Sequence, residues 1–223
     1  MNHMELTERE IELLCAVYPC EDLIREGRLL PNQQQALELL RAGSAWLAAR
    51  YPEEEIRILS FTPGNQFAPW AELRFCCGEG ETVYTVVMEP EEDGCRCADT
   101  LCTARIRPAY DALVEQTLQR AGFPALSLTV FPNPAGKELT TDGSVEALLL
   151  LFPRLKRNTR LFLPAAYDRE GLREELHAAL REAGLYGSYG VAFADPIEGQ
   201  DAARLNESWG ALPHFSFNCF DVG

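Results

Sequence analysis

The stretch from Ile56 to Met88, IRILSFTPGNQFAPWAELRFCCGEGETVYTVVM, decides the fold of this chain. It contains three runs rich in β-branched and aromatic residues, separated by turn signals at Pro63–Asn65 and Gly78–Gly80. The glycines of the second signal accept positive φ, which a tight hairpin turn needs. The pattern therefore predicts three strands of an antiparallel sheet: Ile56–Phe61, Trp70–Cys76 and Val83–Met88.

Side chains alternate between the two faces of such a sheet. In the first strand, this period predicts two sets: Ile56, Ile58 and Ser60 on one face, and Arg57, Leu59 and Phe61 on the other. A fourth extended segment is expected around Cys95–Leu101.

Helical patterns flank the strands. Apolar residues recur at helical spacing from Gln34 to Arg50, with Asn32 as the expected N-cap. After the strands, Arg107–Pro108 is expected to open a second helix, which Gly122 ends. A helix packed on a curled antiparallel sheet would bury both apolar surfaces. We therefore expect an α+β fold with a cystatin-like or NTF2-like arrangement in this part.

The remaining chain supplies an N-terminal helical segment and a second lobe. Thr7 and Glu10 match a capping box ahead of a short helix within residues 4–16. Beyond Gly122 we expect an α+β lobe of alternating strands and helices. The expected strands are Leu126–Phe131, Arg160–Leu163, Tyr189–Phe193 and His214–Val222, and the expected helices are Ser144–Leu151, Asp168–Ala183 and Gln200–Trp209. The expected parts are residues 1–31, 32–122 and 123–223.

Charge limits the kinds of partner. The 223 residues include 34 acidic and 20 basic ones, for a formal net charge of −14. Such a surface repels phosphate backbones and anionic lipid, which argues against nucleic acid, and it suits a basic partner. No run of apolar residues is long enough to span a membrane. The acidic N-terminal residues predict a cytoplasmic protein as the sequence stands, or a secreted or surface-attached one if a leader has been removed.

The eight cysteines raise the question of a metal site. Cys95, Cys97 and Cys102 are the weak candidates for ligands, with Cys76 and Cys77 one hairpin away. Their spacing differs from the paired C-x2-C of zinc sites, and adjacent cysteines on a strand point to opposite faces. We therefore expect no metal, and buried thiols instead.

No known catalytic pattern is present in the sequence. The histidines, His3, His177 and His214, lie in no H-E-x-x-H motif, and the glycines around Ser188 do not form G-x-S-x-G. The acidic residues after the third strand, Glu89, Glu91, Glu92 and Asp93, match no calcium loop. We therefore predict no catalytic residue and no cofactor.

Aromatic residues are the remaining lead. Phe67 and Trp70 lie on either side of Pro69, between the first two strands, and Phe61 and Tyr84 are expected nearby. Together they would form a surface for a small apolar ligand or a protein partner of unknown identity. The alternative is that they face the helix and fill the core.

Two motifs carry a resemblance to a known family. Ile58-Leu59-Ser60-Phe61-Thr62-Pro63 ends a strand, and Ile106-Arg107-Pro108-Ala109-Tyr110 opens a helix after the hairpin. This order resembles a family of uncharacterised proteins from Gram-positive (clostridial) gut bacteria, over the chain from about Gln33 onward. The resemblance implies the fold, but no activity, cofactor or catalytic residue. Other members resemble secreted or lipid-anchored proteins. This chain differs from them in its acidic N-terminal residues, which are unlike the basic start of a leader.

The function expected from these observations is a non-enzymatic binding or protein-interaction module. The alternative is an enzyme with its site in the cleft between the two lobes, using carboxylates or a thiol from distant segments. A third interpretation, a module stapled by metal, requires the candidate cysteines to meet at one point. Convergence of titratable groups in a pocket separates the first two hypotheses.

Overall fold

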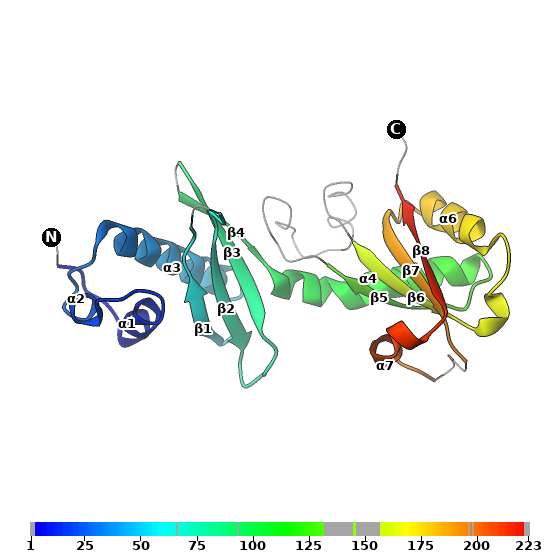
Figure 1. The fold of residues 1–223 in the computed structure, drawn as a ribbon, viewed down its shortest axis with the longest axis horizontal. Coiled ribbons are helices and arrows are strands. Elements are labelled where there is room, and N and C mark those ends of the chain that lie inside the picture. The colour runs from blue at the N-terminus through cyan, green and yellow to red at the C-terminus, as the bar shows by residue number, and fades with distance from the viewer. Residues whose placement is uncertain are drawn as a thin grey trace. The chain divides into compact units, whose positions relative to one another are not determined.

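A computed structural model of the chain describes residues 3–65, 67–92, 94–131, 145, 157–195, 197 and 199–220 (Figure 1). The expected α+β class is confirmed. The described residues form two four-stranded sheets, sheet A with the order β1-β2-β3-β4 and sheet B with the order β5-β6-β7-β8. They divide into two compact units, the first ending at Leu101 and the second beginning at Cys102. The division into residues 1–31, 32–122 and 123–223 stays a prediction.

Three helices precede sheet A: α1 (Glu8–Cys15), α2 (Glu21–Arg25) and α3 (Pro31–Arg50). The predicted capping box of α1 is confirmed, because the Thr7 hydroxyl accepts from the Glu10 amide and the Glu10 carboxylate accepts from the Thr7 amide. The expected N-cap of α3 was wrong: Leu30 is the N-cap and Pro31 is the first helical residue. Proline suits this position because its missing N–H would have no intrahelical partner there.

Sheet A is an antiparallel meander of β1 (Ile56–Thr62), β2 (Ala71–Cys77), β3 (Tyr84–Glu91) and β4 (Gly94–Asp99). The predicted strands are present, and Ile56 and Ile58 share a face as expected, but the expected faces of Ser60 and Phe61 were wrong. A register shift between Ile58 and Ser60 pairs Ile58 with Phe75 and Phe61 with Leu73. One extra residue in β1 therefore brings Phe61 to the same face as Ile58.

Helix α3 packs on this face and contacts all four strands of sheet A. Close approach is possible because Gly43 has no side chain: a Cβ there would lie 2.2 Å from the Met88 Sδ. The fully buried core includes Leu37, Leu40, Leu47, Leu73, Phe75, Val86 and Met88. The strand pairing shows a four-stranded meander. The described strands do not show the expected curl of the sheet.

A buried polar network holds the end of α3 to the end of β4. The Tyr51 hydroxyl donates to the Asp99 Oδ1 at 2.9 Å, and the Asp99 side chain is fully buried. The Arg50 Nε lies 3.3 Å from the Tyr51 hydroxyl oxygen and 3.4 Å from the Asp99 Oδ2. Burial, and the nearby Asp99 carboxylate, raise the pKa of Tyr51, so its hydroxyl stays protonated and able to donate.

The second unit contains α4 (Thr100–Arg120) from Cys102 onward, α6 (Leu172–Glu182), α7 (Ala202–Glu207) and sheet B. Its strands are β5 (Leu126–Val130), β6 (Asn158–Leu163), β7 (Gly187–Phe193) and β8 (His214–Cys219), and two short 3-10 turns are η1 (Ala165–Tyr167) and η2 (Trp209–Ala211). The expected helix Ser144–Leu151 lies outside the described residues except for Val145.

The expected start of the second long helix at Arg107–Pro108 was wrong. Helix α4 starts directly after β4, so Pro108 lies inside it and at its surface. The missing N–H of Pro108 removes one helical hydrogen bond. The buried stripe of Leu101, Ile106 and Tyr110 runs past the proline, and its burial offsets that loss.

Sheet B is mixed, because β6 and β7 are parallel while β5 and β8 pair antiparallel to their neighbours. Phe162 and Ala192 lie on the face that packs on α7 and Trp209. Tyr189 and Phe217 lie on the opposite face, where Phe217 contacts His177 of α6. Helices therefore cover both faces of sheet B.

We expect Tyr51→Phe to destabilise the protein by about 1–3 kcal/mol, because it leaves a buried carboxylate oxygen without its hydroxyl donor. In the unfolded chain a tyrosine ionises near pH ~10, whereas folded Tyr51 stays protonated. The stability that Tyr51 contributes is therefore present below that pH and is lost as the pH rises above it. Urea unfolding of the variant across this range should show a weaker alkaline loss than the wild type.

Tyr84→Phe is the matched control for this variant. Tyr84 lies half-buried in the same unit, and its ring contacts Phe75. We expect a change within about 0.5 kcal/mol. Equal effects of the two substitutions would contradict the role given to the Asp99 network.

We expect Gly190→Ala to destabilise the protein by about 1–3 kcal/mol. A Cβ at Gly190 would lie 2.8 Å from the Trp209 ring, which is also held by the Arg160 guanidinium 4.7 Å above it. Gly210→Ala is the control, because no atom lies within 4 Å of its added Cβ. Urea unfolding measures both, and a neutral Gly190→Ala would show that Trp209 is not fixed on the sheet.

Candidate functional site

The four aromatic residues expected to form a binding surface lie in different environments. Phe61 is buried in the core under α3, and half-buried Tyr84 packs against that core. Half-buried Trp70 donates its Nε1 proton to Glu72 at 3.3 Å. Phe67 is 86% exposed. The structure therefore brings Phe61 and Tyr84 to the core and leaves Phe67 at the surface.

A groove runs beside α3 in the first unit. It consists of two adjoining cavities of about 370 and 350 Å³, which share Gln35, Leu39 and Pro90 as lining residues. We call them together the α3 groove. One cavity lies between α3 and the β1–β2 loop, and the other lies between α3 and the turn from β3 to β4. An extended segment of chain would contact both cavities at once.

The loop at the first cavity has a fixed local shape. The Asn65 Oδ1 accepts hydrogen bonds from the amides of Phe67 and Ala68 at 2.8 and 3.0 Å. A Cβ at Gly64 would lie 2.6 Å from the Pro69 carbonyl oxygen, so only glycine fits this approach. The loop thereby presents Pro63 and Pro69 to the groove and keeps Phe67 exposed next to it.

Carboxylates give the second cavity its charge. Glu38 of α3 and Glu91 and Glu92 at the β3–β4 turn line it, and no lysine or arginine is among the lining residues of either cavity. Arg96 pairs with Glu91 at 3.1 Å. Glu38 and Glu92 form no ion pair with another residue that the structure describes. The groove is therefore anionic at one end and uncharged at the other, where prolines and Leu39 lie beside the amides Asn32, Gln35 and Asn65.

Cys95 lies at the anionic end, and its Sγ is 3.8 Å from the Sγ of Cys97 on the same face of β4. Burial raises the pKa of both thiols, that of Cys97 to about 12. Both sulfurs are therefore held as thiols rather than as the nucleophilic thiolates. Within the described ranges, no three His, Cys, Asp or Glu side chains are placed to hold a metal ion, and Cys102 lies on α4 rather than on the strand.

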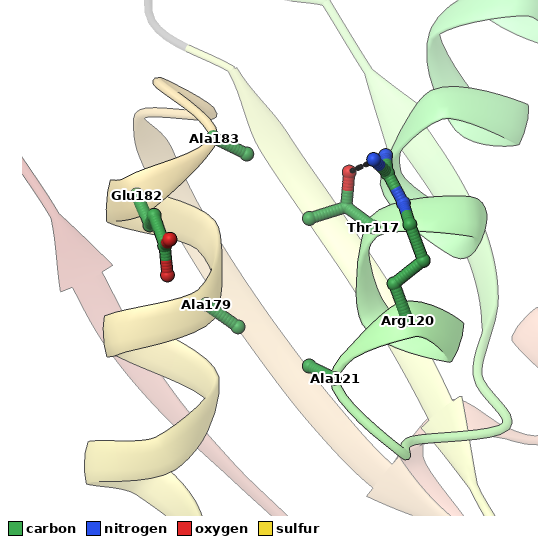
Figure 2. Close-up of a pocket in the computed structure, with 6 residues that line it drawn as sticks. All are labelled: Thr117, Arg120, Ala121, Ala179, Glu182 and Ala183. Atoms are coloured by element: carbon green, nitrogen blue, oxygen red, sulfur yellow. Dashed lines mark hydrogen bonds between the residues drawn. The ribbon is translucent and has the colours of Figure 1, made fainter.

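The second unit has a cavity of about 420 Å³ between α4 and α6. Figure 2 shows Thr117 and Arg120 of α4, with Ala121 directly after it, facing Ala179 and Glu182 of α6 and its C-cap Ala183. The Arg120 guanidinium turns along its own helix and donates to the Thr117 hydroxyl at 3.4 Å. Three of the six lining residues are thus alanines, and none of the six is a histidine or a cysteine.

Buried Arg157 is a residue that the sequence analysis missed. It is 1% exposed, and its guanidinium carbon lies 5.2 Å from the centre of the Tyr110 ring. Tyr189, on the neighbouring strand, donates its hydroxyl proton to the Leu185 carbonyl at 2.7 Å. Burial raises the pKa of Tyr110 and of Tyr189, which keeps both hydroxyls protonated. No motif marks these residues, because they come from α4, from the position before β6 and from β7, and meet only in the fold.

Comparison with protein-family models, with curated proteins and with solved structures gives no match for this chain. None of the described helices is long and apolar enough to cross a bilayer. The proposals below therefore depend on the geometry of the chain itself.

We expect Cys95 and Cys97 to react slowly with iodoacetamide at neutral pH, because their raised pKa values leave little thiolate. Exposed Cys20 should react first. Peptide mass mapping of the native protein over time measures both rates, and the rates of the strand thiols should rise with pH. Labelling of Cys95 ahead of Cys20 would contradict this and would support a nucleophilic role.

Proposed function

We propose that the protein is a non-enzymatic protein-binding module that takes a basic, extended segment of its partner in the α3 groove. The observation that carries this proposal is the continuity of the two cavities along α3, with carboxylates at one end and uncharged residues, prolines and Leu39 among them, at the other. Arginine or lysine side chains of the partner would meet Glu38 and Glu92. An apolar side chain would lie against Leu39 and the prolines.

Charge supports a basic partner over an acidic one. The chain carries a net charge of −14, which raises the rate of encounter with a cation and lowers it with an anion. Specificity then depends on where the carboxylates lie, because the rim charges of an interface set its register. Exposed Phe67 lies beside the groove and adds apolar contact area.

The thiols and the alanine-lined cavity favour binding over catalysis. Catalysis by a cysteine needs a thiolate and a base within hydrogen-bond reach. Burial keeps Cys95 protonated, and its Sγ contacts the Cys97 thiol and the Arg96 carbonyl oxygen, neither of which is a base. The cavity between α4 and α6 offers the Thr117 hydroxyl, which accepts from the Arg120 guanidinium; the Glu182 carboxylate also lines the cavity, but no hydrogen bond joins it to Thr117 among the described residues.

Three finer expectations from the sequence also stand as proposals. A cystatin-like arrangement is supported by the packing of α3 across the four strands of sheet A. Membership in the family of clostridial proteins has the support of the two quoted motifs alone. A cytoplasmic location is likewise proposed from the acidic N-terminal residues.

The test uses a short fluorescent peptide of alternating arginine and leucine residues as the probe, and its glutamate–leucine counterpart as the negative peptide. Fluorescence anisotropy with the full chain should show binding of the basic peptide alone. The double variant Glu38→Lys/Glu92→Lys should raise its dissociation constant by about tenfold or more, which corresponds to about 1.4 kcal/mol.

The double variant Glu79→Lys/Glu81→Lys is the matched control, because it changes the net charge equally at exposed positions outside the described cavities. We expect less than about a threefold change. Equal loss in the two double variants would show that the peptide responds to overall charge, and would overturn the proposed groove.

A further inference from the structure

The two edge strands of sheet B differ in how their outer backbone groups are satisfied. On β5, the Ser127 amide donates to the Glu115 Oε1 at 2.7 Å, and the Thr129 amide donates to the Asp111 Oδ1 at 2.9 Å. Both acceptors belong to α4. This edge is therefore closed by carboxylates of the same chain, which prevents pairing with another strand.

Strand β8 forms the other edge, and one hydrogen bond sets the direction of its backbone groups. The Phe193 amide donates to the Pro213 carbonyl at 3.1 Å. Because such bonds alternate along an antiparallel pair, Phe215, Phe217 and Cys219 direct their backbone groups toward β7. The amides and carbonyls of His214, Ser216 and Asn218 point outward. No residue described in the structure hydrogen-bonds to these outward groups.

Strand β8 also lacks the features that usually protect an edge. Its sequence, HFSFNC, contains no Lys, Arg, Asp, Glu or Pro, and its register with β7 is unbroken. Strand β1 of sheet A provides a contrast, because it has a register shift and Arg9 donates to the carbonyls of Ile58 and Leu59. An unprotected strand rich in aromatic residues is competent to pair with a further strand.

We propose that β8 pairs antiparallel with β8 of a second copy of this chain, to form a two-fold symmetric dimer with one continuous sheet. Ser216 lies opposite Ser216 of the second copy, and His214 lies opposite Asn218 of the second copy. In this register every outward amide and carbonyl of the strand has a partner. Phe215 lies opposite Phe217 of the second copy on the face that α6 covers.

The chemistry of the strand favours a second copy over an unrelated partner. Two chains of net charge −14 repel each other, so their contact needs a segment without carboxylates, and β8 has none. A two-fold axis through Ser216 also pairs aromatic with aromatic and polar with polar residues. This self-complementarity is a property of the alternating sequence of β8.

Sedimentation velocity and amide hydrogen exchange of the full chain test the proposal. The protein should change from monomer to dimer as its concentration is raised. The amides of His214, Ser216 and Asn218 should become protected over the same concentration range. Their exchange rates should be at least tenfold lower in the dimer than in the monomer.

Two variants at Ser216 give a sharper test. Ser216→Pro removes an outward donor but no bond to β7, and Ser216→Lys places like charges opposite each other at the axis. Each should raise the dimer dissociation constant by at least tenfold. Ser208→Lys adds the same charge at an exposed position outside β8 and should leave it unchanged.

A protein that stays monomeric at millimolar concentration overturns the proposal. So does a dimer in which the outward amides stay unprotected, since it would form through another surface. Protection of these amides in the monomer would mean that other residues of the same chain cover the edge, and it overturns the proposal as well. Peptide binding in the α3 groove is measured separately and does not depend on this result.

Discussion

The buried carboxylate of Asp99 is the constraint on which the first unit depends. A fully buried charge is costly unless hydrogen-bond donors surround it. Tyr51 and Arg50, at the end of α3, supply those donors, and both lie 48 or more residues away along the chain. The end of α3 is therefore held at the end of β4, while the rest of the helix packs on sheet A through apolar contacts, with Gly43 placed against Met88.

This position of α3 creates the groove beside it. The helix presents Gln35, Glu38 and Leu39 toward the β1–β2 loop and the β3–β4 turn, and the loop is itself fixed by Asn65 and Gly64. A groove with rigid walls binds an extended segment without a large ordering cost. The second unit uses carboxylates differently, since those of α4 close one edge of sheet B and leave the uncharged edge available.

Local patterns predicted the strands of sheet A and the capping box of α1, because period two, turn glycines and the Thr7–Glu10 spacing act over a few residues. The face of Phe61 could not be predicted, because the bulge depends on pairing with β2. The start of α4 was missed because burial of Ile106 and Tyr110 outweighs the local signal of Pro108. The groove, the Asp99 network and the surroundings of buried Arg157 each combine residues from distant segments, so local patterns could not predict them. The alternation of apolar and polar residues in β8 predicted a strand, but it does not tell an edge strand from a central one.

The most direct measurement of the central claim is a titration of the isotopically labelled full chain with the arginine–leucine peptide, followed by amide chemical shifts. If the α3 groove is the binding site, the perturbed amides will cluster on the Gln35–Leu39 turn of α3, the β1–β2 loop and the β3–β4 turn. Small shifts spread evenly over the acidic surface, or a cluster elsewhere in the chain, would contradict the account.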